Sequence, residues 1–189
     1  MLSNHHAHLS REICQTLFGY PELTVHRQLG SSEFAAKETV TLVGPKGKIE
    51  GIRVLGSVGK KEHSTQVELF KSDCFVLGVD APVRDSGDLA DAAPLTLVGT
   101  VGEVTLEHCA IIALRHIHMG GKMMEMLGVS DREFVSVKAG GERGLVFNRV
   151  LVRRAGDSDK GYLHLDMEEG NAACIKNGDM LEVFVTPDS

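Results

Sequence analysis

The sequence has few aromatic residues and no excess of positive charge. Tryptophan is absent from its 189 residues, and aromatic residues make up only 5%. The core must therefore be built mainly from Val, Leu, Ile and Ala. Acidic residues number 26 against 20 lysines and arginines, which gives a formal net charge of −6. Nucleic-acid-binding domains normally carry a basic face, so we expect no nucleic-acid partner.

Long apolar runs and paired cysteines are also missing. No stretch approaches the roughly 20 apolar residues of a membrane-spanning helix, and the first residues lack the apolar segment of a secretory signal. Cys14, Cys74, Cys109 and Cys174 lie far apart and form no Cys-x-x-Cys motif. Such cysteines are typical of reduced thiols. We therefore expect a soluble cytoplasmic protein with no membrane partner.

Glycine, in contrast, is abundant, with 21 residues against 5 prolines. It separates short runs rich in Val, Ile, Leu and Thr, a pattern typical of strands joined by tight turns. The predicted strands are Leu23–Leu29, Thr39–Val43, Ile49–Leu55, Thr65–Leu69, Leu95–Val98, Val104–Leu114, Phe134–Val137, Leu145–Val152, Tyr162–Leu165 and Met180–Val185. This number of short strands predicts a mainly β fold of two small β-barrels capped by short α-helices.

Four short helical patterns lie between the strands, and each is followed by a glycine. The first begins at Ser10, a good N-cap residue, and ends at Gly19. The others cover about Ser72–Leu77, Lys122–Leu127 and Glu168–Lys176. The polar stretch Ala155–Gly161 is predicted to be one long hairpin loop.

Two short sequence motifs each occur twice along the chain. A His-x-His motif precedes a helix at His6–His8 and again at His116–His118. The sequence Thr-Leu-Val-Gly occurs at Thr41–Gly44 and at Thr96–Gly99, each time before a glycine turn. Repeats of this kind indicate two related substructures that arose by duplication.

The two His-x-His motifs carry the chemical signal. Side chains alternate along an extended segment, so both imidazoles of each pair lie on one face and can bind one ion. Imidazole is the commonest metal ligand in proteins. The sequence therefore predicts metal binding by His6, His8, His116 and His118.

The pattern leaves the other candidate ligands undecided. His5 is either a third ligand or a flanking residue, and His164 belongs either to the core or to a site. Glu68 points either outward from an alternating strand or inward as a ligand. We expect the remaining histidines to be ordinary surface or hydrogen-bonded residues, namely His26, His63 and His108.

Six motifs in one order give the chain a resemblance to a known family. The motifs are His6–Arg11, Thr65–Glu68, Val83–Leu89, Arg115–Met119, Gly141–Gly144 and Asn171–Ala173. Together they resemble the phosphate propanoyltransferase family, the phosphotransacylases associated with bacterial microcompartments and propanediol degradation. The resemblance extends from about Ser3 to Phe184.

The resemblance implies both a fold and an activity. A central β-barrel would span residues 6–113, and a second barrel would combine residues 1–5 with 114–189, with its N-terminal strand largely absent. The activity would be exchange of a propanoyl or acetyl group between coenzyme A and inorganic phosphate. Two zinc ions per chain, close enough to share one substrate, would be held by His6, His8, Glu68, His116, His118 and His164.

The chain departs from the family pattern at three places. His5 stands where members usually carry Arg. The Arg that precedes the Thr65–Glu68 motif in members is missing, so we predict that Lys60 or Lys61 contacts phosphate instead, without the bidentate fork of Arg. Only Met1–Asn4 precede the first histidine motif, which leaves no room there for a microcompartment-targeting peptide.

Further anion contacts are predicted with structural alternatives beside them. Arg84 and Arg115 are candidate catalytic contacts to phosphate, but a surface or interface ion pair explains either residue equally well. Gly141 and Arg143 lie in a glycine-rich loop that suits the phosphates of coenzyme A, although a plain hairpin turn is the favoured interpretation.

Two other functions are consistent with the histidine motifs. A zinc-dependent thioester hydrolase would use the same ligands and release free acid without phosphate. A non-catalytic barrel would use the histidines for a structural metal, although six ligands exceed the four of a closed zinc site. The sequence leaves open whether the protein is a homodimer and whether it lies inside a bacterial microcompartment.

Overall fold

The computed structural model describes residues 1–29, 33–57 and 64–185, and these are mainly β-strand with short helices. The prediction of a mainly β fold is confirmed. Contacts divide the chain into two compact units, one of His5–Ala113 and one of Met1–Asn4 with Leu114–Ser189. The division into two barrel domains, one of residues 6–113 and one of residues 1–5 and 114–189, stays a prediction. Within the described residues, no helix is long and apolar enough to span a membrane.

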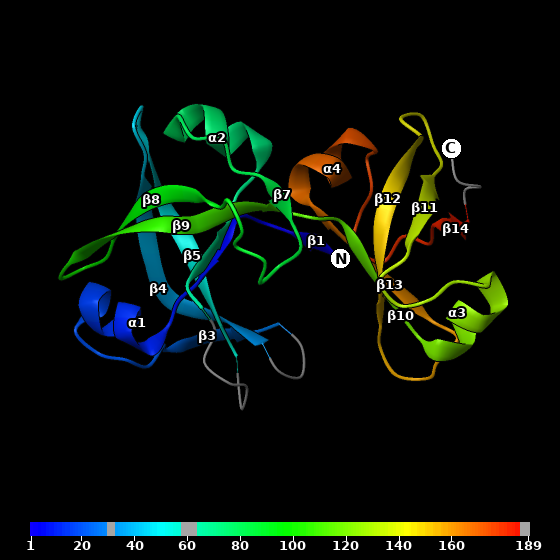
Figure 1. Cartoon of the computed structure of the whole chain (residues 1–189), viewed down its shortest axis with the longest axis horizontal. Coiled ribbons are helices and arrows are strands. Elements are labelled where there is room, and N and C mark those ends of the chain that lie inside the picture. Colours follow the sequence, from blue (N-terminus) through cyan, green and yellow to red (C-terminus); the bar gives the residue numbers. More distant parts are fainter. Residues whose placement is uncertain (30–32, 58–63, 186–189) are drawn as a thin grey trace. The chain divides into compact units, whose positions relative to one another are not determined.

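In the unit His5–Ala113, six strands close into a barrel in the order β4-β5-β2-β6-β9-β8, because β8 pairs with both β9 and β4 (Figure 1). Two short strands, β3 and β7, extend the sheet beyond β4 and β9. The bounds are β2 (His6–His8), β3 (Val25–Gln28), β4 (Glu33–Val43), β5 (Lys48–Ser57), β6 (Gln66–Glu68), β7 (Val83–Arg84), β8 (Ala93–Val98) and β9 (Glu103–Ala113).

The barrel core follows from the alternation of its strands. Val40 and Leu42 on β4 are buried, as are Ile52 and Val54 on β5, whereas their neighbours along each strand are more exposed. Full burial of one such side chain contributes about 1.5–3 kcal/mol. This alternation is what makes the strands predictable from the sequence.

Two helices cover the barrel, and their caps are those that the sequence predicts. α1 (Arg11–Phe18) follows Ser10, whose hydroxyl accepts a hydrogen bond from the Ile13 amide, and ends at Gly19 with φ +84°. α2 (Lys71–Leu77) ends at Gly78 with φ +75°. A left-handed residue at the C-cap is costly for any side chain but glycine, so these glycines fix where the helices end.

The C-terminal end of each helix accepts a hydrogen bond from a β-hairpin turn in the other half of the barrel. The Leu17 carbonyl of α1 accepts a hydrogen bond of 3.0 Å from Val101, between β8 and β9. The Leu77 carbonyl of α2 accepts one of 3.0 Å from Lys46, between β4 and β5. A Cβ at Gly44 would lie 2.3 Å from the Leu77 oxygen, so this close approach requires glycine.

These two contacts between helix ends and hairpin turns are related by an approximate two-fold symmetry within this barrel. The two Thr-Leu-Val-Gly segments pair with each other, with Leu42 opposite Leu97 on antiparallel strands. Strands β2 and β6 pair in the same way around Ala7 and Val67. The Thr-Leu-Val-Gly repeat therefore relates the two halves of one barrel.

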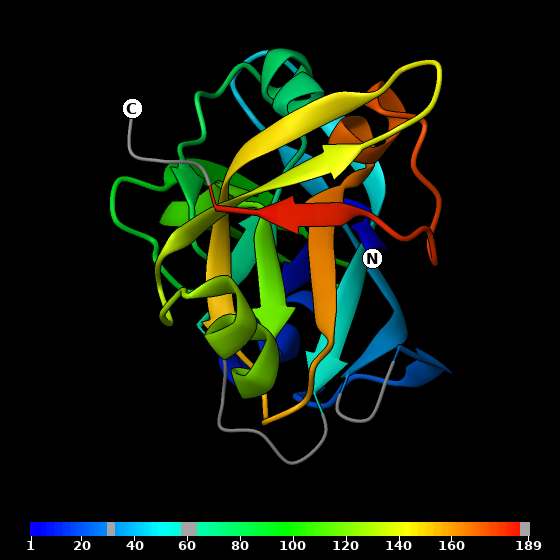
Figure 2. The ribbon, with the colours of Figure 1, turned by 90° about the vertical axis from the view of Figure 1, so that its right-hand side faces the viewer.

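The other unit contains a six-stranded sheet in the order β1-β13-β10-β12-β11-β14 (Figure 2). Its buried core includes Ile117, Val137, Val150 and Val152. The bounds are β1 (Leu2–Ser3), β10 (His116–Met119), α3 (Gly121–Leu127), β11 (Phe134–Ala139), β12 (Leu145–Arg154), β13 (Gly161–Asp166), α4 (Met167–Ala172) and β14 (Glu182–Phe184).

This sheet repeats the strand order of the barrel. β10 lies between parallel β12 and antiparallel β13, as β2 lies between parallel β5 and antiparallel β6. β1 runs parallel to β13, as β9 runs parallel to β6. The strand that follows β8 in the barrel thus corresponds to the first strand of the chain. The two His-x-His motifs occupy corresponding central strands.

Two expectations from the sequence need correction, and some strands were not predicted. Ala155–Gly161 is not a hairpin loop, because it joins β12 to β13 and β10 lies between those two strands. The helix predicted for Glu168–Lys176 ends at Ala172, and Cys174 adopts φ +55°. The short strands β1, β2, β7 and β10 were not among the predicted strands, because they are too short to show a period.

Candidate metal centres

The first candidate centre lies in the barrel and consists of His6, His8 and Glu68. Their ligand atoms all lie within 4.8 Å of one another. Alternation along β2 places both imidazoles on one face, and the antiparallel pairing of β2 with β6 puts Glu68 opposite His6. His6 Nε2 lies 3.5 Å from Glu68 Oε2. Glu68, whose role as a ligand the sequence left undecided, lies beside the two histidines and completes a three-ligand cluster.

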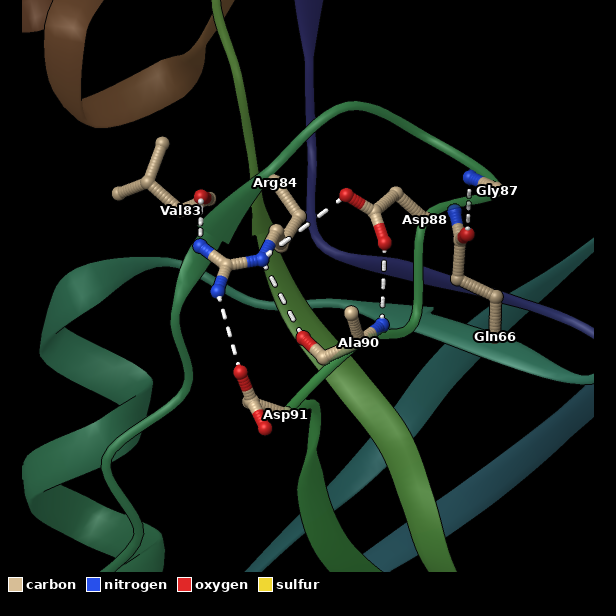
Figure 3. Close-up of polar contacts among 7 residues, drawn as sticks. All are labelled: Gln66, Val83, Arg84, Gly87, Asp88, Ala90 and Asp91. Carbon is tan, nitrogen blue, oxygen red and sulfur yellow. Dashed lines mark hydrogen bonds and ion pairs between the residues drawn. The ribbon is translucent and has the colours of Figure 1, made fainter.

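The two oxygens of Glu68 have different surroundings. Oε1 accepts hydrogen bonds from Gln66 Nε2, at 2.8 Å, and from the Ser86 hydroxyl, at 2.5 Å. Gln66 is itself held by the Gly87 amide, which donates to its Oε1 at 2.7 Å (Figure 3). These contacts orient the carboxylate and leave Oε2 toward His6 as a ligand atom.

The second candidate centre lies in the other unit and consists of His116, His118 and His164. Their ligand atoms also lie within 4.8 Å of one another. The His164 ring centroid lies 4.7 Å from that of His116 and 4.9 Å from that of His118. His164 is opposite His116 on the antiparallel strands β10 and β13. The structure therefore places His164 with the predicted pair.

The environment of this cluster favours a neutral imidazole at His164. Burial, together with the positive charges of His116 and His118, lowers the pKa of His164 to about 3. His116 Nδ1 lies 3.1 Å from the Leu114 carbonyl oxygen, which can only accept, so Nδ1 carries the proton. The Nε2 lone pair of His116 is then available to a metal ion.

Both donor sets fit zinc. Three imidazoles, or two imidazoles and a carboxylate, are the protein ligands of catalytic zinc sites, in which the fourth tetrahedral position remains for water or substrate. Closed structural zinc sites use four protein ligands. Each cluster supplies three such ligands in the described part of the chain, so the chemistry of the donors favours a catalytic metal over a structural one.

Comparisons with known proteins show the family to which the chain is similar. The sequence profile of the phosphate propanoyltransferase family matches residues 1–176. The phosphate propanoyltransferase of Thermotoga maritima is 47% identical over 185 residues, which cover 96% of this chain and 86% of that protein. The phosphate propanoyltransferase of Rhodopseudomonas palustris (strain BisB18) is 45% identical over 185 residues, which cover 96% of this chain and 80% of that protein.

The chain belongs to the phosphate propanoyltransferase family. It is therefore an enzyme of the acyltransferase class. A more distant relative, the phosphate propanoyltransferase of Salmonella typhimurium (strain LT2), is 38% identical over 188 residues, which cover 98% of this chain and 88% of that protein. The resemblance seen in the six sequence motifs is thereby confirmed.

In this phosphate propanoyltransferase family member, His5 lies outside both clusters. Its Nδ1 is 2.8 Å from Asp73 Oδ2, and its ring stacks on Phe70 with centroids 4.8 Å apart. The same Asp73 oxygen accepts a hydrogen bond from the Phe70 amide at the start of α2. His5 therefore joins the strand of the first histidine motif to α2.

Arg115, predicted as an anion contact, is engaged inside its own unit. One of its nitrogens lies 2.6 Å from Glu169 Oε1, and another donates to the Asn148 carbonyl at 3.3 Å. Its guanidinium carbon lies 5.5 Å from the centroid of the Phe147 ring. This is the ion-pair arrangement that the sequence left open, and a role in phosphate binding stays a prediction.

The remaining predicted anion contacts lie in a hairpin turn or outside the described residues. Gly141 and Arg143 lie in the turn between β11 and β12, where the Gly144 amide donates to the Gly141 carbonyl at 3.0 Å and Gly141 has φ +90°. This is a hairpin turn, and coenzyme A binding by it stays a prediction. Lys60 and Lys61 lie outside the described residues.

Sequence reasoning missed Gln66 and Ser86 as functional residues. Both stand in motifs that carry the family resemblance, and Gln66 lies two positions before Glu68 on the same face of β6. A polar side chain two positions before a candidate carboxylate ligand is the signal that points to Gln66. Ser86 has no such signal, because its loop approaches Glu68 only in the folded chain.

Proposed function

We propose that this protein exchanges an acyl group, propanoyl or acetyl, between coenzyme A and inorganic phosphate, with one zinc ion bound by each three-ligand cluster. The observation that carries the proposal is the pair of three-ligand clusters, with the donor sets of catalytic zinc, in a chain of this family. The relatives are phosphate propanoyltransferases, and we take the propanoyl group and phosphate as substrates from that activity.

The reaction forms a bond between a phosphate oxygen and the thioester carbonyl carbon and breaks the bond from that carbon to sulfur. Its main difficulty is the approach of a dianion to a carbonyl whose oxygen becomes negative. Bound zinc would supply positive charge for orienting phosphate and for stabilising the oxyanion. The leaving thiol has a pKa of about 8.5, so it departs as thiolate with little help from an acid.

The residues of the two clusters would make the centres electrostatically unequal. His116, His118 and His164 are neutral ligands, so an ion bound among them would keep its full charge. Glu68 would neutralise one unit of charge in the other cluster. Ser86 and Gln66 limit the motion of Glu68, so the carboxylate would stay in place when an anionic substrate binds nearby.

The test is an assay of thiol release from propanoyl-CoA and acetyl-CoA, with and without phosphate, alongside metal analysis of the same preparation. We expect release to depend on phosphate, acyl phosphate to accumulate, and about two zinc ions per chain. Thiol release without phosphate, accompanied by free acid, would instead identify a thioester hydrolase. Full activity in chelator-treated, metal-free protein would contradict the zinc sites. Association with a microcompartment and formation of a homodimer stay predictions.

A further inference from the structure

The guanidinium group of Arg84 is enclosed by the loop that follows it in the sequence. Arg84 donates hydrogen bonds to the Ala90 carbonyl at 3.2 Å and to the Val83 carbonyl at 3.1 Å (Figure 3). Two carboxylates complete the arrangement: Asp91 Oδ2 lies 3.6 Å from Arg84 Nη2, and Asp88 Oδ2 lies 3.9 Å from Nε. The loop therefore folds around one positive charge.

The same loop holds the carboxylate ligand of the first cluster. Between Arg84 and Ala90 it presents the Ser86 hydroxyl to Glu68 and the Gly87 amide to Gln66. Gly87 has φ +96°, which suits glycine. Asp91, at the other end of the loop, has φ +57°, a left-handed conformation that is uncommon for non-glycine residues but more frequent for aspartate.

The charges around Arg84 argue against a role in binding phosphate. With Asp88 and Asp91 both within 4 Å of its nitrogens, the positive charge is already compensated. Two of its N–H groups are also used, by the Ala90 carbonyl of the loop and by the Val83 carbonyl of β7. An incoming phosphate would have to compete with all four partners.

We propose that Arg84 is a positioning residue for the first metal cluster. It folds the loop so that Ser86 and Gly87 hold Glu68 and Gln66, and Glu68 then presents Oε2 to the metal. This inference rests on the proposed metal site and deepens it. The planar guanidinium directs several N–H donors at once, which a lysine ammonium on a flexible stem does not reproduce.

The experiment compares Arg84→Ala and Arg84→Lys with wild type. Chelator competition measures the affinity for metal, and cobalt(II) absorption follows the cluster of two histidines and a carboxylate separately from the all-histidine cluster. We expect both variants to weaken metal binding at the first cluster about 10- to 100-fold, as for loss of a residue that orients a ligand. The KM for phosphate should stay within about twofold of wild type while kcat falls.

Arg11→Ala is the matched control. Arg11 belongs to the same unit, pairs with Glu22 at 2.9 Å and is exposed, so its removal should leave metal affinity unchanged. Circular dichroism spectra and melting curves establish that each variant is folded. Ser86→Ala gives an independent measurement if Arg84→Ala fails to fold, because it removes the loop's contact with Glu68 alone.

The effects of Arg84→Ala and Ser86→Ala should not add. If Arg84 acts through Ser86 and its loop, Arg84→Ala in a Ser86→Ala background should cost clearly less than in wild type. Full additivity overturns the proposal, as does restoration of metal affinity by Arg84→Lys. A tenfold rise in the KM for phosphate with unchanged metal affinity would make Arg84 an anion contact instead.

The failure of this inference is separable from failure of the proposed function. If His6→Ala leaves metal affinity at the first cluster unchanged in the folded protein, the cluster is not a metal site and the inference is wrong. If wild type binds metal through the cluster but transfers no acyl group to phosphate, the proposed function is wrong. The coupling between Arg84 and metal affinity is then still decided by the chelator measurements.

Discussion

Glu68 and His164 occupy the same position in the two units. Each lies directly opposite the first histidine of a His-x-His motif, across an antiparallel strand pair. In each unit, the strand that carries the motif also has a parallel neighbour on its other side. One arrangement of three ligands is therefore built twice, once with a carboxylate and once with a third imidazole.

Loss of one imidazole should remove one metal ion and most of the activity. We expect His118→Ala to lower turnover at least about 100-fold and to reduce zinc from about two ions per chain to about one. His108→Ala is the control, because His108 lies outside both clusters. Turnover assays and metal analysis of the purified, folded variants check this. Normal turnover in His118→Ala would show that the motif is incidental to catalysis.

The lysines predicted to replace the missing arginine can be tested by steady-state kinetics. If Lys60 or Lys61 holds phosphate, replacing that residue with Ala should raise the KM for phosphate more than the KM for acyl-CoA. A charge-assisted hydrogen bond contributes about 1.5–3 kcal/mol, which corresponds to a rise of roughly ten- to a hundredfold. A KM within about twofold of wild type in both single variants and the double variant would remove these lysines from the site.

The sequence predicted most elements whose signals are local. Ser10 and Gly19 cap α1 as expected, and most of the alternating strands were found to within a few residues, although β4 begins at Glu33 and was predicted only from Thr39. The two rings of each histidine motif also lie together as predicted, because a spacing of two on an extended segment is enough to place them on one face.

The unpredicted features depend on pairing between distant segments. The polar stretch between β12 and β13 has the composition of a hairpin loop, and only the insertion of β10 between those strands shows otherwise. For the same reason the alternation of β6 could not decide whether Glu68 is a candidate ligand. The pairing of β6 with β2 decides it, because it puts Glu68 opposite His6.

The buried carboxylate of Glu38 should make stability depend on pH. Burial raises its pKa, but hydrogen bonds from the Thr24 amide and hydroxyl and from the Tyr20 hydroxyl outweigh this, and the pKa lies below its usual value of 4.5. The folded state therefore binds the proton less tightly than the unfolded state. The resulting stabilisation is complete above about pH 4.5 and is lost as pH falls through the folded pKa.

Glu38→Gln should accordingly destabilise the protein by about 1–2 kcal/mol at pH 7 and by less at pH 3. Urea unfolding at both pH values measures the difference. Glu22→Gln serves as the control, since the Glu22 side chain is 73% exposed. An equal loss of stability at pH 7 and pH 3 would contradict the assigned role of the charge.

Thiol labelling should distinguish one cysteine from the other three. Burial raises the pKa of Cys14 and of Cys109 to about 11, so little of the reactive thiolate forms at pH 8. Cys74 is also buried, whereas Cys174 is exposed. We expect native protein to incorporate one equivalent of iodoacetamide rapidly, at Cys174, as mass spectrometry of the digested protein would show. Rapid labelling of Cys14 or Cys109 would mean that the barrel opens readily.

The hydrogen bonds between helix ends and hairpin turns in the barrel have a consequence for folding. The Leu17 carbonyl is satisfied by the turn before β9, and the Leu77 carbonyl by the turn before β5. Neither half of the barrel can complete its hydrogen bonds until the other is present. Contacts between such distant residues slow folding, so the barrel should form in one late, cooperative step. During synthesis, the ligands of the first cluster would therefore come together only after most of the barrel has left the ribosome.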